Sequence, residues 1–154
     1  MSALGKLIER EITLISRFVT SLQEEQEALK AANPESLPTI HEEKSRLVDQ
    51  LNALENERIQ LVGGSANMPD RERMAAWLQV HPNEKTVAGH WKKLIELAQE
   101  AKRLSDLNAA LVKLHLEKTT QALAILTRHA QENLFYGSDG QAATYTGSRI
   151  VDSA

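Results

Sequence analysis

Glycine and proline are sparse in this chain, and their positions constrain the fold more than any other feature. Among 154 residues there are 7 glycines and 4 prolines. Neither occurs in three long stretches, residues 6–33, 39–62 and 90–136. Because both residue types interrupt helices, each stretch is predicted to be one long helix. A shorter helix is expected between the second and the third, near residues 67–81.

The first stretch repeats apolar residues at alternating intervals of four and three, which is the spacing of a coiled-coil seam. Its members are Leu4, Ile8, Ile15, Phe18, Leu22 and Leu29. Only Glu11 and Glu25 interrupt the seam. We expect an amphipathic helix that ends near Asn33, since a residue before proline avoids helical dihedrals.

The second stretch carries a similar seam, with Ile40, Leu47, Leu54 and Leu61 at intervals of seven. Lys44 and Arg58 occupy two further positions of this seam. Charged residues there indicate a seam near the surface, where long side-chain stems cover the core and the charges stay in water. The two stretches are predicted to form a long antiparallel hairpin with coiled-coil character.

The last helix is predicted to run from about Asn83 to Tyr136 and, at 1.5 Å per residue, to span roughly 80 Å. It would outreach a hairpin of roughly 40 Å, which leaves part of its apolar surface without an intramolecular partner. Apolar side chains point almost all round it between Leu107 and Leu116. For that patch we expect interior packing against both earlier helices. Asn108 is either a buried amide that fixes helix register or an exposed polar residue.

The predicted fold class is all-α, with a single helical domain over residues 1–136 and a flexible tail over residues 137–154. Glycines break the helical pattern at the start of this tail, and Tyr145, Ile150 and Val151 are spaced along it. These three are either ordinary residues of a disordered end or contacts for another chain.

Composition argues against several classes of function. The chain has no cysteine, which excludes disulfides and thiolate sites. Its net charge is −3, without the basic, aromatic-rich face of a nucleic-acid binder. The 5 histidines are scattered, and no nucleophile–base set is visible, so we expect no metal, no cofactor and no enzymatic activity. Without an apolar run long enough for a membrane span or a secretory signal, the expected location is the cytoplasm.

Several segments together resemble a known family. They are "KSRLVDQLNALENER" in the second stretch, "W-KKL" and "SDLNAALV" in the third, and the terminal "LFYGSDGQAATYTGSRIVDSA". In this order the chain is similar to the FlgN-type flagellar export chaperones, which serve the hook-associated (hook–filament junction) proteins.

The resemblance implies a helical chaperone that binds the C-terminal segments of hook-associated proteins, prevents their premature assembly and delivers them to the flagellar export apparatus. It places partner binding toward the C-terminus, and we assign that role to a set of apolar residues there. They are Leu123, Leu126, Leu134, Phe135, Tyr136, Tyr145, Ile150 and Val151. The alternative is a structural coiled-coil protein whose seams serve self-association. A homodimer would fit either interpretation.

Overall fold

The computed structural model describes the backbone of residues 1–136 and the side chains of residues 1–133. Four α-helices follow one another: α1 (Ala3–Lys30), α2 (Leu37–Val62), α3 (Asp70–Val80) and α4 (Lys85–Tyr136). A short 3₁₀ turn, η1 (Pro34–Ser36), precedes α2. The described residues contain no strand, so the predicted all-α fold with three long helices and one short helix is confirmed.

The internal contacts of the chain divide it into two units, Met1–Ala109 and Ala110–Ala154. The first unit holds α1, α2, α3 and the first part of α4, and the described part of the second unit is the remainder of α4. The boundary predicted between residues 136 and 137 stays a prediction, because the residues beyond it lie outside the described part.

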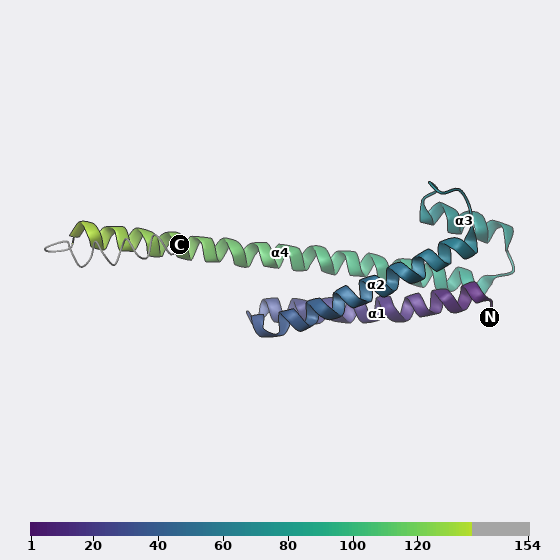
Figure 1. Ribbon diagram of the computed structural model, residues 1–154, viewed down its shortest axis with the longest axis horizontal. Helices are drawn as coiled ribbons and strands as arrows, with labels where there is room; N and C mark the ends of the chain where they lie inside the picture. The colour runs from purple at the N-terminus through teal and green to yellow at the C-terminus, as the bar shows by residue number, and fades with distance from the viewer. Residues whose placement is uncertain (137–154) are drawn as a thin grey trace. The chain divides into compact units, whose positions relative to one another are not determined.

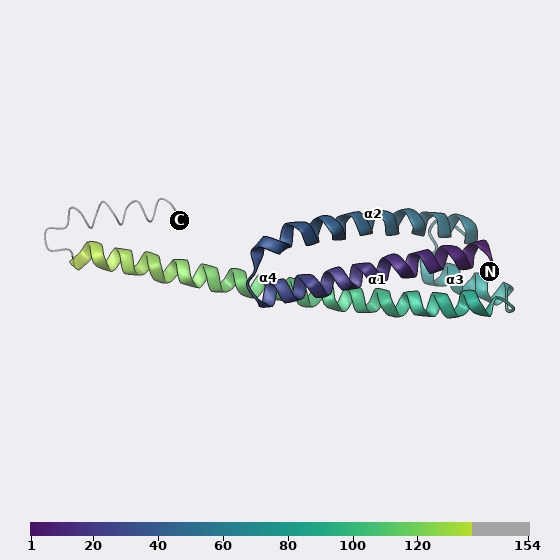
Figure 2. The same cartoon turned by 90° about the horizontal axis from the view of Figure 1, so that it is seen from below.

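The first unit is built around α1. Figure 2 shows α1 lying between α2 and the first part of α4, with α1 and α2 running antiparallel. Apolar residues of α1 and α4 pack into one core together with α3, and its most buried members are Ile8, Leu22, Met74 and Val87. From α2, the seam residues Ile40, Leu47 and Leu54 are buried. The spacing of the apolar positions therefore predicted the buried faces, except that Leu61 of the second seam is 53% exposed.

The turn between α2 and α3 is held by Arg73, a buried residue of α3. Its guanidinium donates hydrogen bonds to the carbonyls of Gly63 and Ser65, the latter at 2.8 Å. Gly63 and Gly64 have φ values of +77° and +99°, which L side chains rarely adopt. The turn thus places α3 next to the end of α2, at the same end of the molecule as the N-terminus (Figure 1).

Helix boundaries depart from the expected ones by a few residues. α1 ends at Lys30 rather than near Asn33, because Ala32 adopts the left-handed conformation with φ 51°. The amide of Asn33 then donates to the carbonyl of Ala28 at 2.9 Å, the pattern of a Schellman cap. α4 begins at Lys85 and continues without a break to Tyr136.

Candidate partner-binding surface

The second unit presents an apolar stripe along α4. Val112, Leu116, Leu123 and Leu126 recur at intervals of four, seven and three, so they share one face of the helix. Their exposed fractions are 52%, 64%, 48% and 60%. Thr119 lies between them, and its hydroxyl donates to the carbonyl of His115 at 3.0 Å. We call these five residues, Val112, Leu116, Thr119, Leu123 and Leu126, the α4 stripe.

The stripe contains no unsatisfied polar group at its centre, because the Thr119 hydroxyl is bonded within the helix. Four large apolar side chains exposed in one row are uncommon on a helix of a folded protein, which normally turns such a face to a core. An apolar row of this kind can bury surface against another helix. What it offers chemically is contact area, not reactivity.

Two other exposed apolar residues of the same helix lie off the stripe. Leu114 and Ile125 are eleven residues apart, about three turns, and share a different face of α4. Ile125 and Leu126 are both 60% exposed, although only Leu126 belongs to the stripe. A comparison of substitutions at Ile125 and Leu126 can therefore distinguish binding by the stripe from binding by any exposed apolar side chain.

The predicted interior packing of the patch between Leu107 and Leu116 is wrong. Leu107, Leu114 and Leu116 are exposed, and so is Val112. A helix that is apolar on several sides needs neighbours on several sides, and α4 is the only element in the described part of the second unit. Val112 and Leu116 are therefore surface residues that the apolar pattern alone did not identify as such.

The predicted binding residues fall in three groups. Leu123 and Leu126 are exposed and lie together on the stripe. Leu134, Phe135 and Tyr136 are the last residues of α4, and their side chains lie outside the described part. The other three, Tyr145, Ile150 and Val151, lie outside the described residues altogether.

A buried ion-pair cluster joins α1, α2 and α3 in the first unit. The Arg58 Nε donates to both carboxylate oxygens of Glu11, at 3.1 and 2.9 Å, and its Nη1 donates to both oxygens of Asp70 at 2.7 Å. The guanidinium also lies 4.8 Å from the ring centre of Trp91 on α4, within the range of a cation–π contact. The expectation that Arg58 keeps its charge in water is wrong, since it is 4% exposed.

Burial and hydrogen bonding act against each other on the pKa values of this cluster. Burial raises the pKa of Glu11 above its ordinary value, and the hydrogen bonds and charge of Arg58 offset this increase only in part. For Arg58, burial favours the neutral form, but hydrogen bonds to Glu11 and Asp70 outweigh burial and raise its pKa. Arg58 is therefore a fixed cation whose role is to compensate buried carboxylates.

A second polar cluster surrounds Glu25 of α1. Lys44 donates to both of its carboxylate oxygens at 3.0 and 2.9 Å, and the Nε2 of His41 lies 2.9 Å from one of them. Asn108 of α4 donates to Glu25 at 2.8 Å and to the carbonyl of Leu22 at 2.9 Å. Asn108 is buried, which decides between its two interpretations in favour of the buried amide.

Burial alone would raise the pKa of Glu25. The hydrogen bonds from Lys44 and Asn108, with the charge of Lys44 and a bond from His41, outweigh burial and lower that pKa below its ordinary value. Lys44 is half-buried, with 23% of its side chain exposed. The prediction that the charged group stays in contact with water therefore fits Lys44 better than Arg58, whose side chain is 4% exposed. Both clusters hold the first unit together, and the carboxylates of Glu11, Asp70 and Glu25 are all bonded to cations within them.

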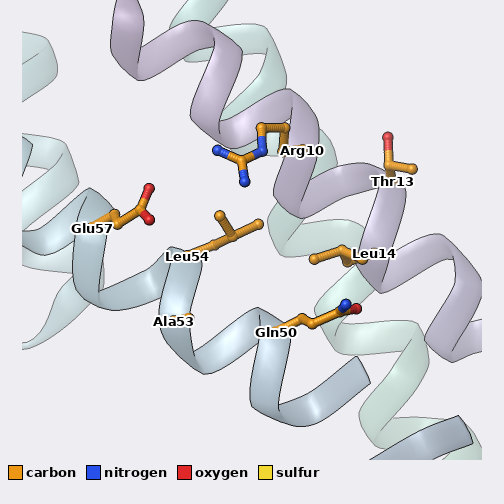
Figure 3. A pocket seen from close by; sticks show the side chains of 7 residues that line it. All are labelled: Arg10, Thr13, Leu14, Gln50, Ala53, Leu54 and Glu57. Carbon is orange, nitrogen blue, oxygen red and sulfur yellow. The ribbon is translucent and has the colours of Figure 1, made fainter. Parts of the chain in front are cut away.

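An open groove of about 380 Å³ lies between α1 and α2 (Figure 3). Leu14 and Leu54 contribute its apolar part, and Arg10, Gln50 and Glu57 its polar side chains. In Figure 3 the Arg10 and Glu57 side chains extend toward one another from the two helices. The groove brings together no nucleophile and base. Within residues 1–133, no group of three or more His, Cys, Asp or Glu side chains could hold a metal ion.

Comparison with known proteins identifies the family. A family model described as "FlgN protein" matches residues 1–144. The chain belongs to the FlgN family. The resemblance stated from the sequence is confirmed, and the match covers all four helices of this FlgN-family chain.

The relatives of this FlgN-family chain carry one name, "Flagella synthesis protein FlgN". The protein of Salmonella typhimurium strain LT2 is 29% identical over 145 residues, which are 93% of this chain and 92% of the relative. That of Yersinia enterocolitica is 31% identical over 147 residues, 92% of this chain and 91% of the relative. The Proteus mirabilis protein is 24% identical over 144 residues, with coverage of 92% and 91%. No solved structure matches the chain.

None of the described helices of this FlgN-family chain is long and apolar enough to span a membrane.

Proposed function

We propose that this FlgN-family protein is a cytoplasmic flagellar export chaperone without enzymatic activity. It binds the C-terminal segments of hook-associated proteins, keeps them unassembled and delivers them to the export apparatus. The family match and the printed names of the relatives support a role in flagellum synthesis. The exposed α4 stripe is the observation that carries the binding role.

The stripe explains how such binding works. An amphipathic segment that waits for assembly exposes an apolar face, and a helix with an uncovered apolar face can bury it. Burial of apolar area drives the association. Ordering the bound segment offsets part of this gain, so the complex stays releasable. Delivery requires release, and a contact made mainly of aliphatic side chains meets that requirement.

The proposed surface continues toward the C-terminus. Leu134, Phe135 and Tyr136 follow the stripe at the end of α4, and we include them as partner contacts. Tyr145, Ile150 and Val151 belong to the same proposal, as residues that contact the bound segment.

Substitution of stripe leucines tests the proposal. Leu123→Ala and Leu126→Ala each remove apolar area from the stripe, and each should weaken capture of the hook-associated C-terminal segments roughly tenfold. Ile125→Ala is the matched control, because Ile125 has the same exposed fraction as Leu126 but lies off the stripe. Isothermal titration calorimetry with purified segments measures the difference. Equal losses in Leu126→Ala and Ile125→Ala would remove the stripe from the binding site.

Truncation tests the terminal residues separately. A chain that ends at Glu132 lacks all six proposed contacts beyond the stripe, and it should keep its helicity while losing most of its affinity for the segments. Circular dichroism monitors the fold, and calorimetry monitors binding. Unchanged affinity would confine the binding site to the α4 stripe.

Self-association is the competing use of the same surface. A structural coiled-coil protein would persist as an oligomer without any client, whereas a chaperone exchanges its own contacts for those of the client. Mass measurement over a dilution series, with and without a hook-associated segment, separates the two. An oligomer that survives dilution and ignores the segment would favour the structural function.

A further inference from the structure

The two edges of the α4 stripe carry one lysine and two histidines, and no carboxylate. In a heptad arrangement, six positions border the stripe, three along each edge. They are Lys113, His115, Thr120, Ala122, Thr127 and His129. Lys113 is positively charged, and a histidine ring carries an N–H group that can donate a hydrogen bond to a carboxylate.

The acidic residues of the same helix segment lie away from these edges. Between residues 110 and 133 the only carboxylates are those of Glu117 and Glu132, and both occupy outer heptad positions that do not border the stripe. Arg128 lies on the side of the helix opposite the stripe. The charge distribution around the stripe is therefore one-sided, although the chain as a whole is acidic with a net charge of −3.

Edge charges determine which helix can pair with an apolar seam. In paired helices the positions beside the seam face each other, and opposite charges there set partner choice. An occupant with glutamate or aspartate at its edges gains an ion pair with Lys113 and can accept a hydrogen bond from the ring of His129. A second copy of this stripe brings no acid to its edges, so self-pairing gains none.

We propose that the α4 stripe selects an amphipathic helix of about two heptads that carries carboxylates along the edges of its apolar face. The inference rests on the proposed function and adds the chemistry of the client. The length follows from the stripe, which at 1.5 Å per residue spans about 21 Å from Val112 to Leu126. The client needs polar residues only at its edges, because the Thr119 hydroxyl at the centre of the stripe already donates a hydrogen bond within α4.

Three synthetic peptides of about 20 residues test this selection on the full chain. They share the same leucine seam and differ only at the edge positions, which are all Glu, all Gln or all Lys. Exposed ion pairs each contribute modestly, so the Glu peptide should bind at least about fivefold more tightly than the Lys peptide at low salt, with the Gln peptide between them. The difference should narrow at high salt, because screening weakens exposed charge pairs. Fluorescence anisotropy of labelled peptides gives the three dissociation constants.

Charge reversal on the chaperone supplies the matched control. The variant Lys113→Glu/His129→Glu should reverse the order, so that the Lys peptide binds more tightly than the Glu peptide. The variant Arg128→Glu changes a cation on the opposite side of α4 and should leave the order unchanged. Circular dichroism verifies that both variants keep their helix content, which these exposed positions favour.

The outcomes separate this inference from the proposed function. Equal binding of the three peptides, failure of all three to bind, or an order that ignores the Lys113→Glu/His129→Glu change would overturn the edge selection. Capture of hook-associated segments that depends on Leu123 and Leu126 would still support the chaperone function in that case. Loss of that leucine dependence, with the peptide order intact, would remove the stripe from the site that binds hook-associated segments but leave the edge selection standing.

Discussion

The buried contact between Arg58 and Glu11 predicts a large and specific loss of stability when one partner is removed. We consider Arg58→Met, which keeps a long apolar stem but removes the guanidinium. Glu11 is 3% exposed and receives two hydrogen bonds from the Arg58 Nε. After the substitution its carboxylate is buried without a cation. Asp70 loses its bonds as well, but its side chain is 30% exposed and can be hydrated.

The expected magnitude follows from the burial of Glu11. Breaking a buried ion pair on one side costs about 3–5 kcal/mol, because the remaining charge is uncompensated. Stabilities of single domains are typically about 5–15 kcal/mol, so Arg58→Met should remove a large share of the free energy of unfolding. The double variant Glu11→Leu/Arg58→Met removes both charges. It should recover most of the loss, because an apolar pair of similar volume replaces a buried ion pair at little cost.

The pH dependence of the single variant gives an independent check. Burial already raises the pKa of Glu11 in the native protein, and removal of Arg58 raises it further. The folded variant then binds a proton more tightly than the unfolded chain, so its stability increases as the pH falls. The deficit of Arg58→Met relative to the native protein should therefore shrink between about pH 7 and about pH 5.

Urea unfolding followed by circular dichroism at both pH values measures these quantities for the native protein and both variants. Two results would refute the reasoning. One is a loss below about 1 kcal/mol for Arg58→Met, which is the range of an exposed pair. The other is a double variant as unstable as the single variant, which would show that Glu11 is not the group left uncompensated.

Two further substitutions test the structure of the first unit. Because the pKa of Glu25 is lowered, the stabilisation that its carboxylate provides is present at neutral pH and is lost as the pH falls through the folded pKa. Glu25→Gln should therefore cost about 1–3 kcal/mol at pH 7, and urea titrations should show this cost shrinking as the pH falls below the ordinary pKa of a glutamate side chain. Ala32 has φ 51°, where an L residue is strained by about 1–2 kcal/mol, so Ala32→Gly should raise stability by about 0.5–1 kcal/mol despite the entropy of glycine. Ala31→Gly is the control in thermal unfolding, because Ala31 has an ordinary φ of −78°, and it should lower stability. An increase in the stability of Ala31→Gly would contradict the assignment of the cap.

Helix number and type were predictable because local signals determine them. The absence of glycine and proline from three stretches, with apolar residues at helical spacing, was enough to place α1, α2 and α4. The ends were less predictable. The short helix was predicted to start near Asn67. In the structure α3 begins at Asp70, with Pro69 as its N-cap residue. Several residues there are compatible with a helix start, and the tertiary contacts of Arg73 select among them.

The buried charges were not predictable one residue at a time. A single arginine in a seam is usually at the surface with a wet head group, and Arg58 departs from this because Glu11 and Asp70 meet it from two other helices. The exposure of Val112 and Leu116 was missed for the converse reason. A densely apolar segment indicates that partners are needed, but it does not indicate whether the same chain supplies them.

The two polar clusters give a reason why the α1–α2 hairpin has one register. Glu11 and Glu25 are 14 residues apart in α1, and their partners Arg58 and Lys44 are 14 residues apart in α2. A slip of one heptad in either direction would keep aliphatic seam residues opposite aliphatic seam residues, but it would place one buried glutamate opposite Leu51. An uncompensated buried carboxylate costs several kcal/mol of stability. Exchanging one aliphatic neighbour for another along the seam costs much less. The charged layers thus specify the alignment that the leucines cannot. The α4 stripe itself has no such charged layer, and its charged residue Lys113 lies at an edge, where it can discriminate between partners.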